Sequence, residues 1–114
     1  MPYINMKTSA KLNTGATEDL KKAFGEAIAL IPGKSERWLM ISFTDECKMA
    51  FAGDSDAPCA MLEVELFGAA SDNAYDALTK RLCEVVAKNT AVSADRVYVK
   101  YAEVGHWGYN GFNF

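Results

Sequence analysis

The stretch Trp38-Leu39-Met40-Ile41-Ser42-Phe43 is a run of apolar residues that only Ser42 interrupts. A run of this kind is typical of a strand that is covered on both of its faces. Pro32-Gly33 lies shortly before it and ends the preceding element. We therefore expect a strand over residues 38–43 that is covered on both of its faces.

A strand and a helix are expected before this run. Residues 3–8 form an apolar stretch typical of a strand, and residues 13–17 then supply turn and N-cap side chains. Glu18 and Asp19 favour the start of a helix, because acidic side chains stabilise the positive end of the helix dipole. One apolar helix face follows at spacings of three and four residues, made by Leu20, Phe24, Ala27, Ile28 and Ile31.

The second half of the chain repeats this plan after an irregular segment at residues 44–58. Residues 61–67 alternate between apolar and acidic positions, which indicates a strand with one buried face. Ser71, Asp72 and Asn73 offer N-caps for a second helix, and residues 97–101 form the next apolar stretch. The apolar face of that helix consists of Tyr75, Leu78, Leu82, Val85 and Val86.

The starts of the two later strands are also alike. Ser35-Glu36-Arg37-Trp38-Leu39 is similar to Ala94-Asp95-Arg96-Val97-Tyr98, which agrees with a duplicated βαβ unit. Each unit is expected to have a right-handed crossover and parallel strands. We thus predict one α/β domain over residues 1–114, with a four-stranded mixed sheet and two helices on one face.

Two helices on one face leave the other face of the sheet uncovered. Because the strand at residues 38–43 is apolar throughout, we expect a second layer to come from other copies of the chain in a closed oligomer. Binding pockets would then lie between subunits, which suits a chain too short to enclose a large pocket of its own.

Composition excludes several classes of function. The net charge of −3 and the absence of a basic run argue against nucleic-acid binding. No apolar stretch is long enough for a membrane span, and no signal segment is visible, so we expect a cytoplasmic protein. The three cysteines, Cys47, Cys59 and Cys83, are widely spaced, so we expect reduced thiols and neither a disulfide framework nor a metal site. The only histidine, His106, is expected at the surface or at a pocket rim.

The amino terminus carries the clearest catalytic candidate. Methionine aminopeptidases remove Met1 when the next residue is small, and this leaves Pro2 with a free secondary amine. An α-amino group titrates below a lysine side chain, and burial at the start of a strand lowers its pKa further. Pro2 is thus a candidate general base near neutral pH, whereas with Met1 attached its nitrogen is an amide and no base.

Several local motifs occur together in a specific order. They are Met1-Pro2 before a strand, Gly33-Lys34, Met49-Ala50-Phe51-Ala52-Gly53, Pro58-Cys59-Ala60, Asp95-Arg96-Val97-Tyr98 and the aromatic tail at residues 106–114. In these motifs nearly the whole chain resembles the macrophage migration inhibitory factor family of the tautomerase superfamily. The resemblance implies a homotrimer with active sites between subunits. It also implies cofactor-free keto–enol tautomerisation of phenylpyruvate-like aromatic 2-oxo acids, for which dopachrome derivatives are surrogates.

The resemblance also implies roles for particular residues. Pro2 matches the catalytic base and Lys34 the lysine that binds the anionic substrate and lowers the pKa of that base. Phe67 matches a position whose backbone amide contacts substrate, and its side chain would narrow the pocket. Tyr98 matches a tyrosine that a neighbouring subunit contributes to the pocket wall.

The chain departs from the family pattern at three places. Lys100 stands where relatives have an asparagine, so it would add a second cation beside Lys34, overcharge the site or point to solvent. The tail differs in length, with Trp107, Tyr109 and Phe114 as the candidates for an aromatic lid. Cys59 lacks the second cysteine of a Cys-x-x-Cys pair, which argues against thiol–disulfide activity.

Two other functions stay open from the sequence. One is a signalling protein that leaves the cell without a signal peptide, acts on a host receptor and keeps only vestigial catalysis. The other is dehalogenation or decarboxylation of unsaturated acids, reactions that call for arginines in the pocket. Arg37 and Arg96 are interpreted as residues at strand starts and Arg81 as a helix residue, which disfavours this second alternative.

Overall fold

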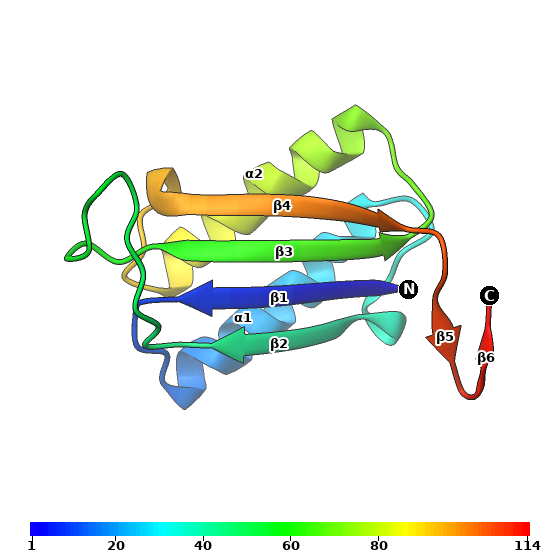
Figure 1. The fold of residues 1–114 in the computed structure, drawn as a ribbon, viewed down its shortest axis with the longest axis horizontal. Helices are drawn as coiled ribbons and strands as arrows, with labels where there is room; N and C mark the ends of the chain where they lie inside the picture. The colour runs from blue at the N-terminus through cyan, green and yellow to red at the C-terminus, as the bar shows by residue number, and fades with distance from the viewer.

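The computed structural model describes all 114 residues as one sheet with two helices packed on one of its faces (Figure 1). The main elements are β1 (Pro2–Thr8), α1 (Thr14–Ala27), β2 (Met40–Thr44), β3 (Ala60–Phe67), α2 (Asp72–Asn89) and β4 (Val97–Val104). The short elements are the 3-10 turns η1 (Ile28–Leu30), η2 (Glu36–Trp38) and η3 (Ala94–Arg96), and the strands β5 (Gly108–Tyr109) and β6 (Phe112–Asn113).

The sheet has the strand order β2-β1-β3-β4. The pairs β1–β2 and β3–β4 are parallel and the central pair β1–β3 is antiparallel, which confirms the mixed sheet of two βαβ units. The predicted helix starts are also confirmed. The side chain of Asn13 accepts a hydrogen bond from the backbone of Ala16, and that of Ser71 accepts one from the backbone of Ala74.

Alternation along the two central strands directs one apolar row toward the helices. Ile4 and Met6 of β1 are fully buried, as are Leu62, Val64 and Leu66 of β3. The apolar faces of the helices close this core with Leu20, Phe24, Leu78, Leu82 and Val86, all without exposed area. Pro2 belongs to the same row, because residues two apart on a strand share one face.

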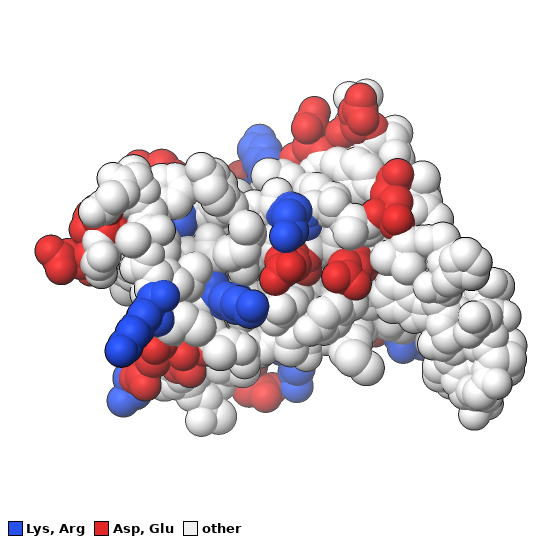
Figure 2. All heavy atoms as spheres, viewed as in Figure 1, with Lys and Arg blue, Asp and Glu red and all other residues white.

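The other face of the sheet carries a row of polar side chains that crosses all four strands. Tyr3 donates to the Ser42 hydroxyl at 2.6 Å, and Ser42 donates to Asn5 Oδ1 at 2.7 Å. Asn5 in turn donates to Glu63 at 3.4 Å, and the Lys100 ammonium lies 3.5 Å from the Glu63 carboxylate. Figure 2 shows this face with acidic and basic side chains next to one another over the sheet. The polar side chains of this face therefore bind one another, although no helix of the chain covers them.

The predicted boundaries of three elements need correction. Strand β2 starts at Met40 and not at Trp38, because residues 36–38 form the turn η2. Met40 is 69% exposed and Ser42 belongs to the polar row, so β2 is not apolar on both faces. Strand β4 continues to Val104, and the tail forms the β5–β6 hairpin, neither of which the apolar pattern indicated.

The similarity between the two strand starts corresponds to a shared structure. Both η2 and η3 are single 3-10 turns that follow an extended serine, Ser35 and Ser93, and each precedes a strand. Aligned on these serines, the two segments are shifted by one residue from the sequence match. The repeat is therefore real in structure but is offset in sequence.

Arg96 fixes the long loop at residues 51–58. Its guanidinium donates to the carbonyl oxygens of Pro58 at 3.0 Å, Ala57 at 3.0 Å and Asp54 at 3.2 Å. It also lies over the ring of Phe51, and only 15% of its side chain is exposed. Arg96 thus adds to the bonds that the loop makes within itself, in which Asp54 pairs with the backbone of Phe51 and accepts the N–H groups of Asp56 and Ala57.

We predict that Arg96→Met lowers the free energy of unfolding by roughly 2–3 kcal/mol, since three partly buried carbonyl groups lose a charged donor. Urea denaturation at a fixed protein concentration measures this loss. Arg81→Met is the matched control, because Arg81 is exposed on α2 and should change stability by less than about 0.5 kcal/mol. Equal stability of the two variants would contradict the role assigned to Arg96.

Candidate active site

Pro2 is the first residue of a central strand and is buried. It pairs with Leu66 of β3, and the next residue, Tyr3, pairs with Met40 of β2. Figure 1 shows that the N-terminus lies at the end of the sheet beside the β5–β6 hairpin and the C-terminus. Hydrogen bonds on both sides of β1 thus hold the amino terminus in a fixed position.

Two cavities meet at the amino terminus, and Met1, Trp38 and Tyr109 line both of them. The larger, of about 550 Å³, also has Pro2, Tyr3, Arg37, Leu39, Met40, Glu65, Trp107 and Gly108 in its wall. We call it the Pro2 cavity. The smaller, of about 390 Å³, is completed by Phe67, Phe112 and Phe114. We call it the aromatic cavity.

The aromatic cavity is built by edge and stacking contacts between rings. Trp38 meets Tyr109 edge-on with ring centroids 5.4 Å apart, and Tyr109 stacks on Phe114 at 6.3 Å. Phe114 also contacts Phe67 at 5.9 Å. In Figure 2 the end of the molecule over β5 and β6 shows neither acidic nor basic side chains. The surface beside the amino terminus is therefore suited to an aromatic or other apolar group.

Lys34 and Phe67 surround the terminal amine. The Lys34 ammonium donates to the carbonyl oxygen of Phe67 at 2.8 Å, and the Phe67 N–H donates to the carbonyl oxygen of Met1 at 3.0 Å. Burial, then the charge of Lys34 and a hydrogen bond with it, lower the pKa of the amino terminus from 8.0 to about 6. This amine belongs to Met1, and it is mainly unprotonated at neutral pH.

The structure thus brings six of the sequence candidates to one end of the sheet: Pro2, Lys34, Phe67, Trp107, Tyr109 and Phe114. The other two, Tyr98 and Lys100, lie elsewhere in the same protomer. Tyr98 pairs with Met61, five residues before Leu66 on β3, so it is offset from Pro2 by about 17 Å along the strand direction and lies two strands away. Its ring contacts Phe51 at 4.9 Å, and Lys100 is paired with Glu63.

Sequence reasoning missed several residues of the two cavities. Trp38 and Arg37 were interpreted as parts of a strand start, although the turn η2 directs both to the amino terminus. Phe112 belongs to the tail but was not singled out, because only the hairpin brings it to Phe114. The alternation of β3 placed Glu65 on the face away from the core, which was the one available signal for its exposure to a cavity. His106 is exposed and lines neither cavity.

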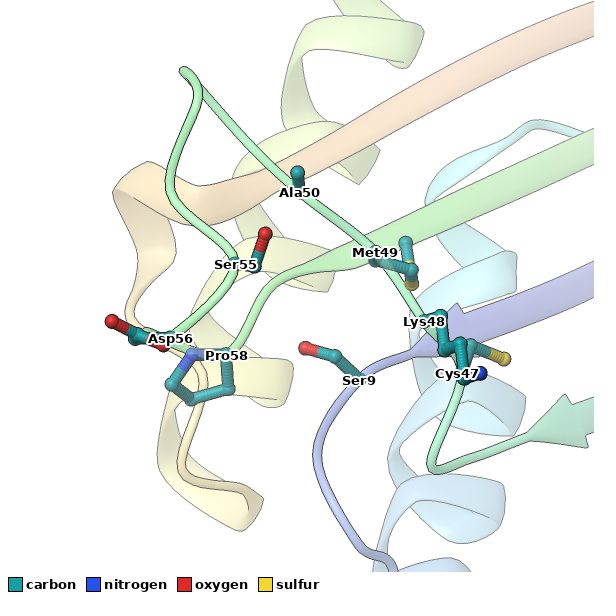
Figure 3. A pocket seen from close by; sticks show the side chains of 8 residues that line it. All are labelled: Ser9, Cys47, Lys48, Met49, Ala50, Ser55, Asp56 and Pro58. Atoms are coloured by element: carbon teal, nitrogen blue, oxygen red, sulfur yellow. The ribbon is translucent and has the colours of Figure 1, made fainter.

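A third cavity, of about 640 Å³, lies at the opposite end of the sheet and is shown in Figure 3. Its polar side chains are those of Ser9, Cys47, Lys48, Ser55 and Asp56. The Cys47 thiol donates to the carbonyl oxygens of Thr44 and Asp45, and the Ser9 hydroxyl accepts the Cys59 N–H. None of these contacts activates a nucleophile, so the amino-terminal end is the stronger candidate.

Comparison with known proteins decides the family. The family model described as "Macrophage migration inhibitory factor (MIF)" matches residues 1–114. The chain belongs to the macrophage migration inhibitory factor family. The sequence resemblance is thereby confirmed.

Individual members of this family are distant but extend over the whole chain. The macrophage migration inhibitory factor of Meriones unguiculatus is 26% identical, with 100% of this chain and 99% of that protein covered. The crystal structure of Leishmania major MIF2 is 31% identical with a TM-score of 0.93, covering 100% of this chain and 97% of that one. The homologue from Prochlorococcus marinus is 27% identical, with a TM-score of 0.88 and 98% of both chains covered.

The helices of this family member give no indication of a membrane segment. Neither α1 nor α2 combines the length and the apolar character that a bilayer-crossing helix needs.

We predict that Lys34→Met raises the pKa of the terminal amine from about 6 toward 8.0 in the Met1-containing chain. The sign follows because a nearby positive charge disfavours the protonated amine, and its removal restores the proton. Burial persists in the variant, so the pKa stays below 8.0. An NMR titration of chain labelled at the Met1 nitrogen measures it.

Lys7→Met is the control for this titration, because Lys7 is exposed at the far end of the same strand. An unchanged midpoint in Lys34→Met would show that Lys34 does not act on the amine.

Proposed function

We propose that this chain is a cofactor-free keto–enol tautomerase for phenylpyruvate-like aromatic 2-oxo acids. One observation carries the proposal: the Met1 amine, next to Pro2, lies where two cavities meet, and burial and the nearby Lys34 lower its pKa to about 6. A general base works best when its pKa is near the working pH, and the same surroundings would lower the pKa of the Pro2 amine once Met1 is removed.

The reaction needs one proton to move between carbon and oxygen. After Met1 is removed, the Pro2 nitrogen takes a proton from C3 of the 2-oxo acid. The electrons of the C–H bond form the C2–C3 double bond, and the carbonyl electrons pass to the oxygen. The Pro2 ammonium then returns its proton to that oxygen, which gives the enol and restores the amine.

The groups around Pro2 suit the charge that develops in this step. The Lys34 ammonium is near enough to the terminus to lower its pKa, so the same charge would stabilise an enolate oxygen there. Removal of Met1 also frees the Phe67 N–H, which then has no backbone acceptor. We assign this N–H to an oxygen of the substrate. The aromatic cavity, with Phe67, Tyr109 and Phe114, receives the ring.

The site also requires a second subunit. Tyr98 is 60% exposed and lies far from Pro2 of its own chain, so it can reach a Pro2 cavity only in another copy. The uncovered face of the sheet and the open edges of β2 and β4 provide the surface for such contacts. We infer a homotrimer in which Tyr98 lines the neighbouring pocket.

Lys100 is two residues from Tyr98 and shares its face of β4, so it belongs to the same proposed boundary. The two-cation hypothesis places Lys100 beside Lys34 of the neighbour. The ion pair with Glu63 weakens this hypothesis, because it balances the Lys100 charge within the protomer. Lys100→Asn is therefore expected to change KM less than Lys34→Met does.

The names of the relatives support a second function, in which the chain acts as a signalling ligand for a host receptor. The same exposed aromatic end would then be the contact surface. A ligand of the Pro2 cavity that competes with receptor binding would support this shared contact surface, and a ligand without effect on the receptor would argue against it.

The central prediction is that Pro2→Ala lowers kcat/KM for phenylpyruvate by about 10²- to 10⁴-fold, as expected for the loss of a general base. Alanine still permits removal of Met1, so the variant isolates the change of amine. Circular dichroism checks that the fold is retained. Full activity in a preparation whose intact mass includes Met1 would refute the role of Pro2.

Mixed assemblies test the contribution of Tyr98. Pro2→Ala and Tyr98→Ala chains should each be weakly active alone. If the two residues meet across subunits, co-refolded mixtures should regain about a quarter of the wild-type activity, because random assembly restores that share of sites. Analytical ultracentrifugation should give the mass of three chains. Mixtures no more active than their parents would place Tyr98 outside the site.

A further inference from the structure

The two positively charged side chains near Pro2, Lys34 and Arg37, lie in different surroundings. With Met1 in place, Lys34 lines neither the Pro2 cavity nor the aromatic cavity: its ammonium donates to the carbonyl oxygen of Phe67 at 2.8 Å and lies beside the Met1 amine. Arg37 is the cation that lines the Pro2 cavity itself. The two side chains therefore act on different parts of a ligand.

The guanidinium of Arg37 is free of internal partners. No carboxylate lies within 4.0 Å of it, in contrast to Arg96, Lys21 and Lys100, which are all paired. It rests over the ring of Trp38 at 5.1 Å from the ring centroid. Stacking on an indole leaves the edge donors of the guanidinium available, and this planar fork matches the geometry of a carboxylate.

The turn that carries Arg37 is fixed to the helix layer. Glu36, the first residue of η2, packs its side chain over Gly25 of α1, where a Cβ atom would collide with it. The backbone N–H of Leu39 closes the turn on the Glu36 carbonyl at 3.1 Å. Arg37 is thus presented to the cavity by a rigid segment.

The opposite wall of the Pro2 cavity has the opposite charge. Glu65, Tyr3 and Met40 are direct neighbours on β3, β1 and β2, so Glu65 is about 10 Å across the sheet from the β2 side. Arg37 comes just before β2, on that side. A carboxylate in this cavity is therefore attracted to one end and repelled from the other.

From this arrangement we propose that Arg37 is the carboxylate-binding residue of the site, with Glu65 setting the orientation of the substrate by repulsion. Lys34 then acts on the terminal amine and on the developing enolate oxygen. The inference rests on the proposed function and extends it, because it assigns binding of the carboxylate to Arg37 and assistance of the proton transfer to Lys34. The substrate class is a 2-oxo acid whose carboxylate faces Arg37 and whose side chain enters the aromatic cavity.

The experiment compares phenylpyruvate with its ethyl ester, which keeps the ketone and the ring but has no carboxylate charge. Arg37→Met should raise KM for the acid about 10-fold or more, because hydrogen bonds to charged groups contribute about 1.5–3 kcal/mol. KM for the ester should change less than about 2-fold, because the ester has no carboxylate charge for Arg37 to bind. The acidic limb of the pH–rate profile should stay in place. Arg37→Lys should restore part of the affinity for the acid, and Glu65→Gln should lower its KM.

A non-reacting carboxylate makes the test independent of turnover. Calorimetry with 3-phenylpropanoate should show the same loss of affinity in Arg37→Met, and no loss in Arg81→Met, which removes one positive charge from α2. Equal losses for the acid and the ester would show that Arg37 only supports Trp38 and would overturn the proposal. Unchanged binding of 3-phenylpropanoate in Arg37→Met would overturn it as well, even if the chain proves to be no tautomerase.

Discussion

The pairing of β1 with strands on both of its sides is the constraint on which the rest of the structure depends. A chain terminus usually frays, because it lacks partners on at least one side. Here β2 and β3 hold the first residues of β1, and the Phe67 N–H binds the Met1 carbonyl oxygen, so the terminal amine has a defined position. Its burial and the nearby Lys34 charge then act on a defined atom, and both lower the pKa of the amine.

The tail of the chain supplies half of the wall of the aromatic cavity beside the amino terminus. The short β5–β6 hairpin brings three aromatic residues back to the amino terminus, where they meet Trp38 and Phe67. The same packing thus gives an apolar surface and surrounds the Met1 amine, whose pKa is lowered by burial and by Lys34. Arg37 and Glu65 give the neighbouring cavity its polarity.

The sequence was sufficient for those parts of the fold that local pattern determines. Alternation at residues 61–67 predicted β3, and the caps Asn13 and Ser71 predicted both helix starts. It failed where a tertiary contact overrides the pattern: Trp38 reads as strand but belongs to a 3-10 turn anchored by Glu36 on Gly25. The residues of the candidate site divide in the same way, between those that a local motif indicates and those that a tertiary contact brings in. Pro2 and Lys34 were recognisable from motifs, whereas Arg37 and Phe112 enter the cavities only through a turn and a hairpin.

Both chain ends lie at the same end of the sheet (Figure 1), and both make backbone hydrogen bonds with other segments. The last residue, Phe114, donates its N–H to the carbonyl oxygen of Trp107 at 3.0 Å and contributes its ring to the aromatic cavity. An affinity tag at either terminus would therefore alter the very surface under study. The tip of the loop at Gly53, at the opposite end of the molecule and open to solvent, is the place where an inserted label or reporter would leave the amino-terminal end of its own protomer untouched.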